Sequence, residues 1–150
     1  MLRLSRRTML ALEAVLDVAY NARPQPVQSK DITARQGIPQ RYLEQVMQQL
    51  VHHGILKGVR GPKGGYTLAR ERRRITVGDV VRIVDQIDAE ADSEPVSQAE
   101  LGDRVVAPLW ADTREAILDR LDKVTMEDLC NRARKLGIAH GAKLKPDFNI

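Results

Sequence analysis

The side chains that most often carry out chemistry in proteins are scarce in this sequence. The cysteines and histidines are Cys130, His52, His53 and His140. A zinc site or an iron–sulfur cluster needs about four such ligands close together, so we predict no metal site and no cofactor. No acid–base pair, activated nucleophile or nucleotide loop can be recognised, and we expect no enzymatic activity. Cys130 is expected to be a small buried residue, with a redox-sensing thiol as the alternative.

Polar side chains that can recognise bases gather instead in one predicted helix, which begins at Pro39 and ends at residues 52–54. Its buried stripe is predicted to be Leu43, Val46, Met47 and Leu50. The opposite face has little net charge and consists of Gln40, Arg41, Glu44, Gln45, Gln48 and Gln49. Glutamine can pair with adenine and glutamate can accept from cytosine, so this face suits the major groove of DNA.

A short helix and a turn precede this segment. Ser29 is expected to cap a helix that ends near Gln36, and Gly37 supplies the turn. Ile38 is placed to fill the gap between the two helices. Two helices joined in this way, the second with a polar face, indicate a helix-turn-helix.

A basic hairpin follows, with strands expected at residues 55–59 and 66–69. The loop between them reads Arg60-Gly61-Pro62-Lys63-Gly64-Gly65. The glycines permit a tight turn, and the two cations place positive charge at its tip. No helix opens after the glycines, which excludes a phosphate-cradling nucleotide loop. We interpret the hairpin as a wing that contacts phosphates or the minor groove, with residues 70–74 adding charge at its base.

Three more helices are expected around these elements. The first covers residues 8–22, with Glu13 and Asp17 opposite its apolar face. That apolar face comprises Met9, Leu12, Val15, Leu16 and Ala19. Thr76 is expected to cap the second. The apolar residues of the second are Val77, Val80, Val81, Val84 and Ile87. Thr125 is expected to cap the last, which runs to Leu136.

A longer helix is expected to start near Arg104. Its apolar stripe is longer than the preceding domain needs. We interpret it as a dimerisation helix, with packing inside one chain as the alternative. The residues expected to pair two chains are Val106, Trp110, Ile117 and Leu121.

Charge is divided unevenly along the chain. Residues 1–84 hold 15 basic and 6 acidic side chains, whereas residues 85–150 hold 9 basic and 14 acidic ones. A basic N-terminal half indicates a polyanionic partner, although solvated surface charge would look the same. No stretch of roughly eighteen residues is apolar and uncharged. We therefore expect a cytoplasmic protein without a membrane span or a signal peptide.

The predicted fold class is mainly α-helical with a small β-wing. The expected parts are a winged helix-turn-helix DNA-binding domain at 1–87, an acidic linker at 88–103, dimerisation helices at 104–137 and a tail at 138–150.

Several motifs resemble one known family. They are Tyr42-Leu43-Glu44-Gln45, residues 59–69, Ile75-Thr76-Val77-Gly78-Asp79-Val80, Leu109-Trp110 and residues 124–129. Together they make roughly residues 1–130 similar to the IscR/NsrR/CymR (Rrf) family of bacterial winged-helix regulators. The resemblance implies a homodimer whose long helices cross and whose heads read a pseudo-palindromic operator in double-stranded DNA. It also implies that residues 40–49 enter the major groove.

We expect Gln40 or Gln45 to pair with adenine and Glu44 with cytosine. Arg41 is expected to hold either a base or a phosphate. The full set of expected DNA contacts is Ser29, Gln40, Arg41, Tyr42, Glu44, Gln45, Gln48, Arg60, Gly61, Pro62, Lys63 and Gly64.

The sequence departs from the family's pattern in one place. Well-known members hold an iron–sulfur cluster with three cysteines just before the Leu-Trp pair. Here residues 92–107 contain neither cysteine nor histidine. Acidic and amide side chains are poor substitutes for thiolates, so a standard cluster is rejected. The resemblance is therefore to the cluster-free, CymR-like branch.

The chain ends in Pro146-Asp147-Phe148-Asn149-Ile150. This end resembles the termini by which serine acetyltransferases insert into cysteine synthase, with a tail matching by chance as the alternative. We expect a homodimeric repressor of sulfur or cysteine genes whose tail docks into cysteine synthase. Two alternatives stay open: an iron–sulfur or redox-responsive regulator with non-standard ligation, and an enzyme-binding protein without DNA binding.

Overall fold

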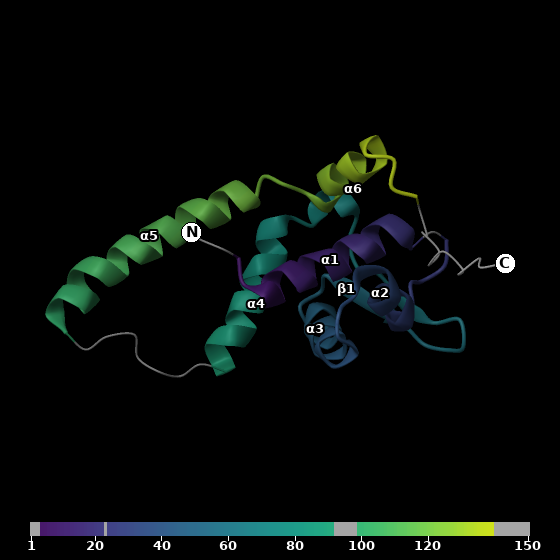
Figure 1. The fold of residues 1–150 in the computed structure, drawn as a ribbon, viewed down its shortest axis with the longest axis horizontal. Helices are drawn as coiled ribbons and strands as arrows, with labels where there is room; N and C mark the ends of the chain where they lie inside the picture. The colour runs from purple at the N-terminus through teal and green to yellow at the C-terminus, as the bar shows by residue number, and fades with distance from the viewer. Residues whose placement is uncertain (1–3, 23, 92–98, 140–150) are drawn as a thin grey trace.

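The computed structural model describes residues 4–22, 24–91 and 99–139 and confirms the predicted fold class (Figure 1). The elements are α1 (Arg6–Asn21), α2 (Ser29–Gln36), α3 (Gln40–His52), β1 (Leu56–Val59), β2 (Gly65–Leu68), η1 (Arg72–Arg74), α4 (Val77–Ala91), η2 (Gly102–Val106), α5 (Ala107–Leu121) and α6 (Met126–Lys135). We call α1 to α4, the sheet, η1 and α6 the head. Helix α5 extends away from it (Figure 1).

Helix α1 lies at the centre of the head, with α2 and α3 on one side and α6 on the other (Figure 1). It begins two residues earlier than predicted, because the hydroxyl of Ser5 accepts the backbone N–H of Thr8 at 3.2 Å. Its fully buried residues are Ala11, Ala14, Val15 and Val18. Met9, which was predicted to be on the apolar face, is 45% exposed.

Asp17 is also placed differently from the prediction, since it is only 3% exposed. Its carboxylate accepts two hydrogen bonds from Arg35, at 2.9 and 2.8 Å, and one from Gln36 at 2.8 Å. These contacts fix the last turn of α2 against α1. The hydrogen bond to Asp17 also raises the pKa of Arg35, so this guanidinium stays charged.

Helices α2 and α3 form the predicted helix-turn-helix. Gly37 ends α2 in the left-handed conformation with φ 65°, and Ile38 fills the gap between the helices at 1% exposure. Ser29 is the first residue of α2, so the cap position belongs to Gln28. The predicted stripe of α3 is confirmed, because all four of its residues are buried: Leu43, Val46, Met47 and Leu50.

The hairpin is an antiparallel pair in which Leu56 faces Leu68 and Val59 faces Gly65. The first strand begins one residue later than predicted and ends at Val59 as predicted, and the second lies one residue earlier than predicted. Val27 adds a bridge to the second strand through bonds to Tyr66, at 2.9 and 2.8 Å. A Cβ atom at Gly65 would overlap the carbonyl group of Val27, so this close approach requires glycine.

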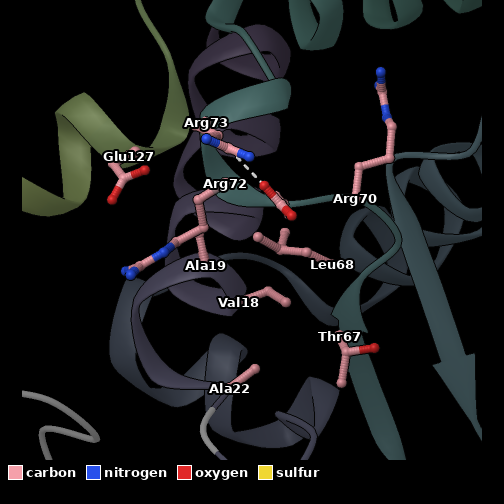
Figure 2. A pocket seen from close by; sticks show the side chains of 10 residues that line it. Val18, Ala19, Ala22, Thr67, Leu68, Arg70, Arg72, Arg73 and Glu127 are labelled. Carbon is pink, nitrogen blue, oxygen red and sulfur yellow. Dashed lines mark hydrogen bonds and ion pairs between the residues drawn. The ribbon is translucent and has the colours of Figure 1, made fainter.

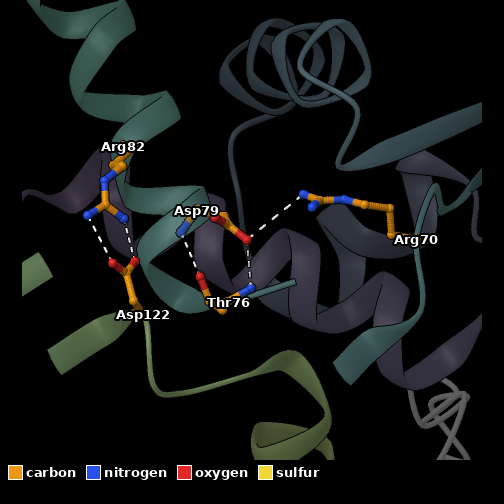
Figure 3. A network of polar contacts seen from close by, with 5 residues as sticks. All are labelled: Arg70, Thr76, Asp79, Arg82 and Asp122. Carbon is orange, nitrogen blue, oxygen red and sulfur yellow. Dashed lines mark hydrogen bonds and ion pairs between the residues drawn. The ribbon is translucent and has the colours of Figure 1, made fainter. Parts of the chain in front are cut away.

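A polar network joins α4 to the end of α5 (Figure 3). Thr76 caps α4 as predicted: its hydroxyl accepts the N–H of Asp79, whose carboxylate accepts the N–H of Thr76, both at 3.0 Å. Farther along α4, Arg82 forms a bidentate ion pair with Asp122, which follows α5. This pair lowers the pKa of the Asp122 carboxyl. The ion pair between Arg114 and Asp85, at 2.7 Å, adds a second link.

Helical structure extends from both sides into residues 88–103, which were predicted to be a linker. Helix α4 continues to Ala91, and helical backbone resumes at Glu100, ahead of the predicted start near Arg104. Residues 92–98 lie outside the described ranges. The only residue of α5 that is buried is Leu118, at 3% exposure, and the sequence analysis did not single it out.

Helix α6 begins with a capping box between Thr125 and Asp128. Cys130 lies on its inner face and is 0% exposed, which confirms the predicted burial. The helix ends at Lys135, one residue before the predicted end, and Gly137 follows with φ 74°. None of the helices within the described ranges has the length and the apolar character needed to cross a bilayer.

Candidate DNA-binding surface

The outer face of α3 is available to a partner along its whole length. All six residues predicted to face away from the core are exposed: Gln40, Arg41, Glu44, Gln45, Gln48 and Gln49. The side-chain amide of Gln40 donates a hydrogen bond to the carboxylate of Glu44 at 3.2 Å. The surface therefore offers amide donors and acceptors and one oriented carboxylate, which are the groups that read base edges.

The wing lies on the same side of α1 as α2 and α3 (Figure 1). A hollow of about 530 Å³ separates the N-terminus of α2 from the wing, and both Ser29 and Arg60 line it. The side-chain amide of Gln28 donates to the carbonyl oxygen of Pro62 at 3.3 Å and so connects the wing to α2. Helix N-termini attract phosphate, because their backbone N–H groups are unpaired.

Four cations surround this hollow and the start of α3. They are Lys30, Arg41, Arg60 and Lys63, and all are exposed. Within the described ranges, none of them pairs with a carboxylate. Gly61 and Pro62 are also exposed at the tip, whereas Ser29 and Gly64 are half-buried. Positive charge without internal partners is what a phosphate backbone requires.

Tyr42 differs from the other residues predicted to contact DNA. It is half-buried, and its hydroxyl donates to the backbone carbonyl of Arg7 at 2.5 Å. Burial, opposed by the charge of Arg7, raises the pKa of the phenol to about 12. The hydroxyl is therefore directed at α1.

The four predicted dimerisation residues differ in solvent exposure. Val106, Trp110 and Ile117 are 59%, 53% and 42% exposed. Leu121 is partly buried and packs against the core of its own head. The exposed face also includes residues that the sequence analysis did not assign to it: Leu101, Val105 and Leu109. The predicted partner-binding residues Asp147, Phe148, Asn149 and Ile150 lie outside the described residues.

A second hollow, of about 450 Å³, lies between α1, β2 and η1 (Figure 2). Arg73 pairs with Glu71 there at 2.6 Å. Arg70 and Arg72 point away from each other, so they do not form a joint anion site (Figure 2). Segment η1 contacts α6, which lies across α1 from α3 (Figure 1). Arg72, Arg73 and Arg74 therefore lie beside α6 and away from α3, and Arg70 pairs with Asp79 of α4 at 3.9 Å.

Comparison with known proteins identifies several relatives of similar length. The family model Rrf2, described as an iron-dependent transcriptional regulator, matches residues 4–132. The HTH-type transcriptional regulator IscR of Pectobacterium atrosepticum is 36% identical over 139 residues, which cover 92% of this chain and 85% of that protein.

Two solved structures are similar over most of their length. IscR of T. potens has a TM-score of 0.72 and 32% identity, with 93% of each chain covered. CymR, the global cysteine regulator of B. subtilis, has a TM-score of 0.68 and 31% identity, with 88% of this chain and 98% of that chain covered.

The residues of this chain do not fit the iron that the family description names. The sole cysteine, Cys130, is enclosed in the core of the head. Across the described ranges, no three histidine, cysteine, aspartate or glutamate side chains gather closely enough to hold a metal ion. An iron–sulfur cluster is held mainly by cysteine thiolates, and one buried thiol cannot supply them.

Proposed function

The chain belongs to the Rrf2 family of transcriptional regulators, and from that membership we propose that it binds operator DNA as a homodimer and represses genes of sulfur or cysteine metabolism. The relatives are named as regulators, so a DNA-binding regulator and not an enzyme is the established part. The observation that carries the rest is the exposed amide-rich face of α3 beside a basic wing. A repressor would act in the cytoplasm, where its operator is found.

The two parts of this surface have different roles in the proposal. Helix α3 enters the major groove, where Gln45 pairs with adenine and Glu44, held by Gln40, accepts from cytosine. Arg60 and Lys63 on the wing bind phosphates or the minor groove, and the N-terminus of α2 binds a third phosphate. The cations supply affinity for any duplex, and the amides supply the choice of sequence.

Removing the wing cations tests this division of roles. Arg60→Ala and Lys63→Ala should weaken binding to all duplexes. Each should also lower the slope of log affinity against log salt by about 0.9, because one phosphate contact is lost. The measurement is a salt titration with operator and with unrelated DNA. Lys57→Ala is the matched control, since this exposed lysine lies on β1 away from the tip. A change in the preference for one base, with an unaltered salt slope, would contradict the phosphate assignment.

Dimerisation is supported by the exposed apolar face of α5. A dimer also suits an operator with two half-sites, because each winged head of a dimer contacts one half-site. The alternative of an interaction protein without DNA binding predicts no shift of the DNA upstream of its own gene in a mobility assay.

The sulfur-specific part rests on two observations. One solved neighbour is named a global cysteine regulator, and the ligands for an iron–sulfur cluster are missing here. We further propose that the tail docks into cysteine synthase. Deleting residues 148–150 should abolish association with that enzyme in a titration and leave dimerisation intact. If the truncated protein bound cysteine synthase with unchanged affinity, the proposed role in sulfur metabolism would be contradicted.

The iron-responsive alternative has a separate test. It predicts visible absorption and bound iron in protein purified without oxygen. A colourless, iron-free sample that still binds the operator would exclude it.

A further inference from the structure

The first turn of the reading helix α3 is connected to two other helices through one arginine. The Tyr42 hydroxyl donates to the carbonyl oxygen of Arg7, near the start of α1, at 2.5 Å. The guanidinium carbon of Arg7 lies 5.7 Å from the centre of the Tyr42 ring, within the range of a cation–π contact. The same guanidinium forms an ion pair with Asp88 of α4 at 3.1 Å.

This arrangement constrains α3 more than packing alone would. A backbone carbonyl within α1 is a fixed acceptor, so the hydrogen bond from Tyr42 sets both the position and the rotation of the first turn. The phenol is a protonated donor at neutral pH, as an ordinary tyrosine is, and burial raises its pKa further, to about 12. Its hydroxyl is already used within the head and does not need a phosphate partner.

The neighbouring residues of α3 depend on that rotation. Arg41 and Glu44 lie one residue before and two residues after Tyr42, and both are exposed. Helix α3 moves as a rigid body. A small rotation about its axis therefore moves all the side chains on its exposed face together. Recognition of base edges requires placement within a few tenths of an ångström, whereas contact with phosphates tolerates more.

We propose that Tyr42 is a positioning residue for the reading helix and not a DNA contact, and that the Arg7–Asp88 ion pair holds it in place. The inference rests on the proposed function, because it assumes that α3 reads a sequence. The inference adds that the start of α1 and the end of α4 together set how strongly α3 prefers one DNA sequence over another.

The test compares Tyr42→Phe and Asp88→Asn with the wild type. Each dimer is titrated with a duplex that the wild type selects from random sequence, and with unrelated DNA. We expect Tyr42→Phe to lose affinity for the selected duplex by about threefold to tenfold, as the loss of one hydrogen bond implies. Asp88→Asn should lose less, about twofold to fivefold, because its ion pair with Arg7 is partly exposed. Affinity for unrelated DNA should stay within about twofold, because no phosphate contact is lost.

Glu90→Gln is the matched control. Glu90 also carries a carboxylate on α4, two residues after Asp88, and it is exposed, but the partner of Arg7 is Asp88. It should leave both affinities unchanged. The double variant Tyr42→Phe with Asp88→Asn should lose less than the product of the two single effects, because both act through Arg7.

Three outcomes would overturn the inference. Equal losses on selected and unrelated DNA would show a direct phosphate contact by Tyr42. A lower melting temperature with unchanged affinities would show that Tyr42 only packs. If the wild-type protein selects no duplex at all, the proposed function itself fails, and the positioning role fails with it.

Discussion

A single carboxylate, that of Asp17, holds the two helices before the turn together. It is almost completely buried and accepts three hydrogen bonds, two of them from Arg35. Local sequence pattern could not reveal this, because a carboxylate on the polar side of a helix is usually solvated. Its partners lie 18 and 19 residues away in the chain. Periodicity describes one helix at a time, whereas this contact depends on where a second helix lies.

We predict that Asp17→Asn lowers the free energy of unfolding by about 3 kcal/mol, because it leaves the largely buried guanidinium of Arg35 without its counter-charge. Urea unfolding measures the change. Glu71→Gln is the control: it breaks an ion pair whose side chains are 65% and 62% exposed, and it should have little effect. Equal losses in the two variants would show that Asp17 is no more than a surface charge.

At the scale of elements, local pattern predicted most of what is found. The apolar stripe of α3, the turn at Gly37 and the caps at Thr76 and Thr125 follow from periodicity and capping rules. The wing was also found from its glycines and cations. The exposed face of α3 could therefore be predicted from sequence. The hydrogen bond of Tyr42 could not, because it joins residues 35 positions apart.

The wing is joined to a residue that lies far from it in the chain. Val27 pairs with Tyr66 through an isolated bridge, and this pairing needs the close approach at Gly65. We predict that Gly65→Ala separates the wing from Val27. It should lower the free energy of unfolding by about 1–3 kcal/mol and weaken DNA binding.

Chemical denaturation and a DNA titration measure these two effects. Gly58→Ala is the control on the partner strand, because a Cβ atom there meets nothing within 4 Å. If both variants behave like the wild type, the bridge at Val27 does not position the wing.

At the scale of the whole molecule, the apolar stripe of the long helix serves two purposes. The sequence showed one continuous stripe that was interpreted as a dimer interface. In the structure its C-terminal end packs against the head through Leu121 and the neighbouring Leu118, whereas its N-terminal part is exposed around Trp110. Spacing alone could not divide the stripe, because both halves repeat at the same helical period.

We predict that Trp110→Glu converts the dimer into monomers, as measured by sedimentation. The melting temperature of the head should not change, because Trp110 is 53% exposed and outside the core. Operator affinity should fall by about a hundredfold or more, because linking two binding modules raises affinity by about 10²–10⁴. Asp112→Ala, an exposed polar position on the same helix, is the control. Dimers that persist in Trp110→Glu would place the interface elsewhere.

The attachment of α5 at Leu118 has a mechanical consequence. The 18 residues from Leu101 to Leu118 form a rod about 25 Å long whose C-terminal end is fixed to the head. A tilt of about 10° at the fixed end would move the free end by about 4 Å, close to the rise of one base pair. In a pair of such chains, the packing of Leu118 and Leu121 together with the ion pairs between α4 and α5 would set how many base pairs separate the two half-sites.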